Sequence, residues 1–331
     1  MRKAVRIFDV AREAGVSPGT VSKVLNGTQR MAADTEARVW KAVSKLGYQA
    51  NWHARILSTG RSEALGVVIL DILNPHFTAL VKGASRVASN QGYTVLLADA
   101  EEDPGRELNL IQSLRARTDG LILAGSRLSD QQIASLHSPE QPIVTVGRRI
   151  PGVPSVTVDE YTASLQLTGH LVAQGCRRIV YLAGPPFWVN QERERGYQDA
   201  LTQAGLPPQV FRLASPDLLG GEQASALLWT VQPFPDGVIC YNDLVAIGLM
   251  ASLRTLGVRV PQDVAVAAFG NHPLAAHLSP GLTHMEIPSR KLGELATDLL
   301  VELLKKPQEA SHVQQYAVLR PRGSTQRLEV G

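Results

Sequence analysis

The stretch from Asp9 to Asn26 constrains the fold of this chain most strongly, because it has the pattern of two short helices joined by a tight turn. Alanines and valines at its start follow helical spacing, and Gly15 then supplies a residue that tolerates a left-handed backbone. Ser17 is placed to cap a second helix, and Pro18 stands at its first position, where a missing N–H costs nothing. The polar side chains that this second helix turns outward are Thr20, Ser22, Lys23 and Asn26.

Charge is divided unevenly between this N-terminal part and the rest of the chain. Residues 1–61 hold eleven lysines and arginines against four acids, a net charge of +7, whereas the other 270 residues hold 22 basic and 26 acidic side chains, a net charge of −4. A small helical hairpin alone is compatible with ordinary packing. A basic head on a mildly acidic body favours a module that binds phosphates.

Two further segments complete the head. A third helix is expected over about 34–46, with an apolar stripe formed by Val39, Trp40, Val43 and Leu46. Residues 51–58 form one short potential helix, well below the roughly 12 to 15 residues that an isolated helix needs in water. We therefore expect this segment to fold only when it contacts a partner.

From residue 65 onward, short apolar strands alternate with amphipathic helices. Strands are expected over 65–70, 93–98, 120–124 and 142–146, and a second cycle follows with strands over 178–183, 237–241 and 264–269. Continuous apolar strands joined by helices predict parallel sheets that are covered on both faces. Two such sheets in one chain leave a cleft at the carboxyl ends of their strands, where ligands bind.

The pattern of the head, continued by Leu46-Gly47-Tyr48 and Asn51, closely resembles the lactose-repressor family of bacterial transcription regulators, and the likeness extends to the C-terminus. It implies an N-terminal three-helix helix-turn-helix DNA-binding domain plus a hinge helix, followed by an α/β periplasmic-binding-protein-like core of two doubly wound parallel-sheet subdomains. The implied boundaries are 1–50 for the DNA-binding domain, 51–62 for the hinge helix and linker, and 63–331 for the effector-binding and dimerisation core, whose N-subdomain spans about 63–161 plus 288–314 and whose C-subdomain spans about 162–287 plus 315–331.

The resemblance also implies which residues contact DNA. In the family, a leucine at the position of Leu57 wedges into the minor groove, although plain interdomain packing is the alternative for this residue. Thr35 is implied as a backbone contact, with a solvated helix start as the alternative. The whole expected set is Ser17, Gly19, Thr20, Ser22, Lys23, Asn26, Thr35, Tyr48, Asn51, Ala54 and Leu57.

For the cleft, the resemblance places Arg193 in the position of an arginine that forks onto ligand hydroxyls or carboxylates. The alternative is a surface arginine paired with Glu192 or Glu194. Trp188 is expected to stack on a ligand or to anchor its loop. The whole expected set is Asp71, Phe77, Arg148, Trp188, Arg193, Asn242 and Asn271.

The chain departs from the family pattern inside this expected cleft. It reads Ala268-Phe269-Gly270-Asn271 where the family commonly has Gly-Phe-Asp-Asp, and Gly147 stands where an Asp is frequent. Two fewer acids beside Arg148 and Arg193 favour an anionic ligand, because a buried negative charge is repelled by like-charged neighbours. The expected effector is therefore a sugar acid, a sugar phosphate or another small anion.

Other classes of protein are poorly matched. The sequence contains no phosphate loop, no nucleophile elbow and no set of metal ligands, so neither an enzyme nor a bound cofactor or metal is expected. The charged N-terminus and the lack of an apolar run of about 18 residues argue against export and membrane spanning and favour the cytoplasm. The predicted function is a sequence-specific transcriptional regulator, expected to be a repressor, that binds pseudo-palindromic operator DNA as a homodimer under the control of a small effector. The alternative is a small-molecule-binding sensor protein without DNA function.

Overall fold

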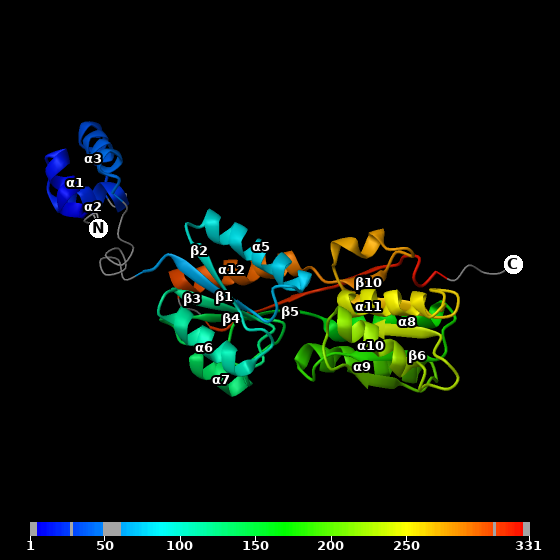
Figure 1. Cartoon of the computed structure of the whole chain (residues 1–331). Coiled ribbons are helices and arrows are strands. Elements are labelled where there is room, and N and C mark those ends of the chain that lie inside the picture. Colours follow the sequence, from blue (N-terminus) through cyan, green and yellow to red (C-terminus); the bar gives the residue numbers. More distant parts are fainter. Residues whose placement is uncertain (1–4, 27–28, 49–60, 307–308, 327–331) are drawn as a thin grey trace. The chain divides into compact units, whose positions relative to one another are not determined.

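A computed structural model of the chain describes residues 5–26, 29–48, 61–306 and 309–326. The chain divides into two compact units, Met1–Ser62 and Glu63–Gly331 (Figure 1). Residues 51–60 of the predicted hinge lie outside the described ranges. Among the described helices, none is long and apolar enough to cross a membrane.

The N-terminal unit contains three helices, α1 (Ile7–Ala14), α2 (Pro18–Asn26) and α3 (Ala33–Leu46). Gly15 ends α1 with φ 65°, and the Ser17 hydroxyl accepts a hydrogen bond from the Thr20 N–H at 3.0 Å, so the predicted turn and cap are both present. The three helices enclose a small apolar core, whose buried residues are Val10, Ala11, Ala14, Val21, Val24, Val39 and Ala42.

The prediction that Trp40 belongs to the apolar core of this unit is wrong. Trp40 is 51% exposed, whereas Ala42 is buried. A helix turns by about 100° per residue, and the stripe through Val39 and Val43 leaves the position directly after Val39 on its flank. The small Ala42 lets α3 approach the other two helices closely, and the indole of Trp40 lies outside that contact.

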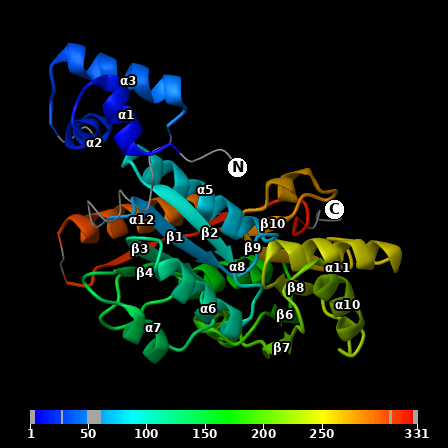
Figure 2. The same ribbon diagram turned by 60° about the vertical axis from the view of Figure 1, so that its left-hand side comes forward.

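The first lobe of the second unit is built on a six-stranded sheet in the order β11-β5-β4-β3-β1-β2, and all its neighbouring strands are parallel. Its strands are β1 (Ala64–Ile69), β2 (Thr94–Asp99), β3 (Gly120–Ala124), β4 (Ile143–Val146), β5 (Ser155–Val158) and β11 (His312–Gln315). Val67 and Ile69 face α5 (Pro75–Asn90) and α12 (Ser289–Lys305), while Val68 faces α6 (Pro104–Arg115) and α7 (Asp130–Leu136). Helices therefore cover both faces of the sheet (Figure 2).

The second lobe repeats this plan in the order β12-β10-β9-β8-β6-β7, with β12 antiparallel to β10 and every other pair parallel. Its strands are β6 (Ile179–Ala183), β7 (Gln209–Arg212), β8 (Gly237–Cys240), β9 (Ala265–Gly270), β10 (Thr283–Glu286) and β12 (Val318–Arg320). Tyr181 faces α8 (Glu160–Ala173) and α9 (Trp188–Gln203), whereas Leu182 faces α10 (Leu218–Leu228) and α11 (Asp243–Thr255). The short 3-10 helix η1 spans Pro273–His277. The two doubly wound parallel-sheet subdomains that were predicted are confirmed.

The chain crosses between the lobes after β5, after β10 and after β11. Helix α12 packs closely on α5, because Gly293 lies against the Leu80 carbonyl and Gly83 against the Arg290 carbonyl, at points where an added Cβ would be 2.0 Å from each oxygen. Strand β12 ends directly before Pro321, which cannot donate to a ladder.

Candidate functional site

The start of α2 presents a polar, uncrowded edge. Ser17 and Gly19 are exposed, and the Ser17 hydroxyl lies 2.9 Å from the Thr20 hydroxyl. Gly19 has no side chain, so another molecule can approach its backbone closely. Lys23 lies one turn further along the same helix and is exposed. Asn26 is the last residue of α2.

Two further predicted DNA contacts, Thr35 and Tyr48, lie in the described part of the head, and three lie outside it. Thr35 lies half-buried in the first turn of α3, where a helix N-terminus attracts anions. Tyr48 packs against the core of the unit, and its N–H donates to the Val43 carbonyl at 3.1 Å. The residues that lie outside the described part of the chain are Asn51, Ala54 and Leu57.

Lys23 differs from three other cations of the head, which are held in ion pairs. Within the residues that the structure describes, no acid lies within ion-pair distance of Lys23, and the ammonium group is free to meet a phosphate or a base edge. Three other cations are already paired: Arg12 with Asp9 at 3.7 Å, Arg38 with Asp34 at 3.2 Å, and Lys45 with Glu13 at 2.7 Å.

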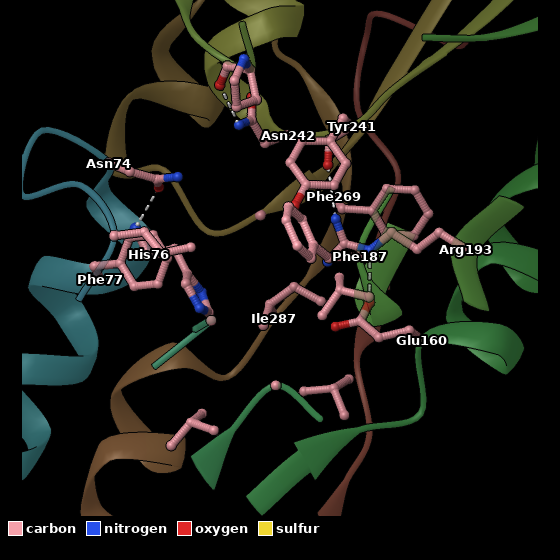
Figure 3. Close-up of a pocket in the computed structure, with 18 of the residues that line it drawn as sticks. Asn74, His76, Phe77, Glu160, Phe187, Arg193, Tyr241, Asn242, Phe269 and Ile287 are labelled. Atoms are coloured by element: carbon pink, nitrogen blue, oxygen red, sulfur yellow. Dashed lines mark hydrogen bonds and ion pairs between the residues drawn. The ribbon is translucent and has the colours of Figure 1, made fainter. Parts of the chain in front are cut away.

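In the second unit, a cleft lies at the carboxyl ends of β1, β3 and β4 from one lobe and β6, β8 and β9 from the other. Figure 3 shows Asn74, His76 and Phe77 on one side and Arg193, Tyr241 and Phe269 on the other. Six of the seven residues expected in the cleft line it: Phe77, Arg148, Trp188, Arg193, Asn242 and Asn271. Asp71 instead lines an adjoining outer hollow, and its carboxylate accepts a hydrogen bond from the Leu73 N–H at 2.8 Å.

Arg193 extends from α9 into the cleft wall and is buried. Its Nε lies 2.7 Å from Oε2 of Glu160, and its Nη1 donates to the Tyr241 carbonyl at 2.8 Å (Figure 3). The guanidinium also lies 4.2 Å from the centre of the Phe269 ring. Burial alone would lower the pKa of Arg193, but the Glu160 carboxylate outweighs burial and raises that pKa.

The alternative of a surface arginine is wrong, because both acids next to Arg193 in sequence pair elsewhere. Glu192 pairs with Arg195 at 2.8 Å, and Glu194 pairs with Arg212 at 2.9 Å. The partner of Arg193 is Glu160, which the sequence reading missed. Its signal was available: Glu160 is the second residue after β5, and residues at the carboxyl ends of parallel strands meet at one edge.

His76 is a second cleft residue that the sequence reading missed. Its Nδ1 lies 2.8 Å from the Ser289 hydroxyl, and its ring meets Phe77 edge-on with centroids 5.0 Å apart. Burial, with a smaller effect from Arg193, lowers the pKa of His76 to about 4. The imidazole is therefore neutral at neutral pH, and it brings no charge to the cleft.

Arg148 keeps one unused donor. Its Nη1 lies 3.2 Å from Asp130, and its Nη2 donates to the Leu128 carbonyl. Its Nε is buried and has no hydrogen-bond partner in the described part of the chain. A buried donor without a partner is costly, so a hydrogen bond from this N–H to a ligand oxygen would remove that cost.

Gly270 stands where this structure has no room for a side chain. A Cβ at this residue would lie 2.3 Å from Oδ2 of Asp243. Asp243 is buried, and its two oxygens accept from the His272 N–H at 2.6 Å and meet Nδ1 of His284 at 3.2 Å. The Asp243 carboxylate thus occupies the space that a side chain at position 270 would need.

Acids from other segments offset the positive charge of Arg148 and Arg193, from which an anionic effector was expected. Three arginines line the cleft, and each faces a carboxylate: Arg127 faces Glu102, Arg148 faces Asp130, and Arg193 faces Glu160. Asp243 adds a further acid to the lining. The sequence reading counted the two missing acids, but it did not place the acids that fold in from other segments.

Comparisons with known proteins cover both units. A model for "Bacterial regulatory proteins, lacI family" matches residues 6–51, and a model for a "Periplasmic binding protein-like domain" matches residues 168–325. The chain is 31% identical to the HTH-type transcriptional regulator RegA of Clostridium saccharobutylicum, over 92% of this chain and 93% of that protein. It is 32% identical to the HTH-type transcriptional regulator GalS of Salmonella typhimurium, over 90% of this chain and 89% of that protein.

Solved structures agree with these relatives. The lac repressor dimer bound to operator and the anti-inducer ONPF matches with a TM-score of 0.87 at 25% identity, covering 98% of this chain and 99% of that chain. The cellobiose complex of the transcriptional regulator CelR matches with a TM-score of 0.72 at 27% identity, covering 97% of this chain and 99% of that chain.

Proposed function

Because the chain belongs to the lacI family of bacterial regulatory proteins, we propose that it represses transcription by binding operator DNA as a homodimer, and that a small effector in the cleft controls this binding. The observation that carries the proposal is the presence in one chain of a basic three-helix head with an exposed α2 and of a two-lobed cleft with buried polar groups. The proposed place of action is the cytoplasm, which contains the bacterial chromosome.

In this proposal α2 lies in the major groove of each half-site. Lys23, Ser22 and Asn26 read base edges, while Gly19 allows the backbone to approach the DNA. Ser17, Thr20, Thr35 and Tyr48 position the head on phosphates. Asn51, Ala54 and Leu57 remain predicted contacts of the hinge.

For the effector, we propose a sugar acid, that is, a sugar-derived compound with one acidic group. The unused Nε donor of Arg148 supports an oxygen contact, and the polar groups of the buried Arg193 and the half-buried Asn242 suit hydroxyls. The carboxylates of Glu160 and Asp243 oppose a dianionic phosphate, because they bring like charge close to it. A sugar acid therefore fits this cleft better than a sugar phosphate.

Titration calorimetry with matched probes tests the effector class. Glucose, gluconate and glucose 6-phosphate differ mainly in charge, as do galactose, galactonate and galactose 1-phosphate. We expect the monoanion of a set to bind more tightly than its phosphate ester. Tight binding of a neutral sugar alone, or of a phosphate ester alone, contradicts the proposed acid.

Selection of duplexes from a random pool tests the regulator itself. Purified full-length protein should enrich an inverted repeat, and Lys23→Ala should weaken binding to that repeat. If no duplex is preferred over random competitor, with or without the probes, the sensor protein without DNA function becomes the better description.

A further inference from the structure

A contact between charged and aromatic side chains joins the two lobes at the edge of the cleft. Arg127 follows β3 in the first lobe, and Phe187 lies directly before α9 in the second. The Arg127 guanidinium carbon lies 4.1 Å from the centre of the Phe187 ring. Both residues line the cleft and also the adjoining hollow that Asp71 lines. It is made by the chain's own side chains and does not require an effector.

Two glutamates hold Arg127 in position. Its Nε lies 2.7 Å from Oε2 of Glu102, and its own N–H donates to Oε2 of Glu107 at 2.8 Å. The Arg127 side chain is only 7% exposed. Because these contacts already fix the guanidinium, the stacking on Phe187 costs little further side-chain entropy.

The loop that supplies Glu102 has an uncommon backbone. Glu101 and Glu102 have φ values of 51° and 60°, in the left-handed region that residues with a Cβ seldom adopt. The Glu102 N–H donates to the Leu70 carbonyl at 2.9 Å, and Glu101 pairs with Arg106 at 2.8 Å. Such strain persists where surrounding contacts determine the conformation, and it is typical of segments that hold a working side chain in place.

We propose that Arg127 and Phe187 form a latch that holds the two lobes together at the mouth of the cleft, with Glu102 as the positioning residue that aims Arg127. Separation of the two lobes at this point breaks the contact. A single cation–π contact shifts an equilibrium by about 2- to 30-fold, which is strong enough to favour a closed cleft and weak enough to open without unfolding. The latch acts whichever compound the cleft binds, so it does not depend on the proposed effector class.

Phe187 directly precedes Trp188, for which stacking on a ligand or anchoring of its loop was expected. The structure assigns one face of Phe187 to Arg127 instead. Removal of the aromatic ring should therefore loosen the closure.

The distance between the lobes in full-length protein tests the latch directly. Nitroxide labels on Gln131→Cys in α7 and Gln203→Cys in α9 report on this distance, because both positions are exposed while the native Cys176 and Cys240 are buried. Phe187→Leu keeps the apolar bulk and the Arg127–Glu102 pair but removes the ring. Arg127→Met removes the cation.

Arg195 offers a matched control. It also pairs with a glutamate and lies over an aromatic ring, Tyr161 at 4.5 Å, but both partners belong to helices α8 and α9 of the second lobe. Pulsed electron paramagnetic resonance should show a longer-distance population that grows at least twofold in Phe187→Leu and Arg127→Met, no change in Arg195→Met, and recovery in Phe187→Tyr. Unchanged distances in Phe187→Leu and Arg127→Met, or an equal shift in Arg195→Met, overturn the latch.

Discussion

The charge of Lys23 is available to DNA. It is exposed and has no acid within ion-pair distance in the described part of the chain, whereas Lys45 is 2.7 Å from Glu13. We expect Lys23→Ala to weaken operator binding by about 1–3 kcal/mol and to relax the base preference at one position of each half-site. Fluorescence anisotropy at fixed salt, with Lys45→Ala as the control, measures both effects. Equal losses in the two variants would contradict a specific role for Lys23.

His76 makes a prediction about acid stability. Burial lowers its pKa from 6.5 to about 4, so below pH 6.5 the unfolded chain binds a proton that the folded chain does not. Stability is therefore complete above pH 6.5 and falls as the pH drops toward 4, by about 3 kcal/mol for this one group. Chemical denaturation of the core across this range measures the slope.

The matched variants for this slope are His76→Gln and His277→Gln. Glutamine cannot take up the proton, so the first variant should flatten the loss of stability between pH 6.5 and 4. His277 is exposed, and its replacement should leave the slope as it is. A slope that is the same in all three proteins would show that the buried imidazole does not set the acid response.

Arg193 and Gly270 show what could and could not be predicted from the sequence. Arg193 was placed in the cleft from its motif, but its partner Glu160 lies 33 positions earlier and is joined to it only by the fold. The loss of an acid at Gly270 was visible in sequence, whereas the Asp243 carboxylate that occupies its space was not. Motifs locate single side chains, and long-range packing decides the charge that they share.

Elements were easier to predict than contacts between them. The alternation of apolar strands and helices indicated both sheets, because a strand buried on two faces reads as a continuous apolar run such as 65–70. Trp40 was misplaced, because helical periodicity alone does not say which flank of α3 meets its neighbours. The close packing of α5 on α12 depends on two glycines whose role the sequence pattern does not reveal.

These glycines give a prediction for one pair of helices. A Cβ at Gly293 would lie 2.0 Å from the Leu80 carbonyl oxygen, so Gly293→Ala must push α12 away from α5. We expect a loss of about 1–3 kcal/mol or more in the free energy of unfolding. Gly169 in α8 has nothing within 4 Å of its Cβ position, and Gly169→Ala should add about 0.5–1 kcal/mol through helix propensity. Urea denaturation compares them, and effects of the same sign in both variants would contradict this account.

At the scale of the whole molecule, two compact units of opposite net charge share one chain. Residues 1–61 carry +7 and the remainder carries −4, so the head supplies the attraction to DNA and the core opposes it. Each lobe contains its own complete sheet, and the lobes meet at the cleft. Control of DNA binding by a ligand then requires that the ligand discriminate between two arrangements of the dimer.

That requirement gives a prediction that holds whether the effector releases DNA or promotes its binding. If a compound changes operator affinity by a given factor, saturating operator must change the affinity of that compound by the same factor, because coupling between two binding sites is reciprocal. The core alone, residues 63–331, should bind the compound without any response to operator and should show no affinity for DNA. Calorimetry on the full chain, on the full chain with operator and on the core measures the three affinities. A compound that shifts operator binding tenfold while its own affinity is the same with and without operator would show that it acts outside this coupled pair of sites.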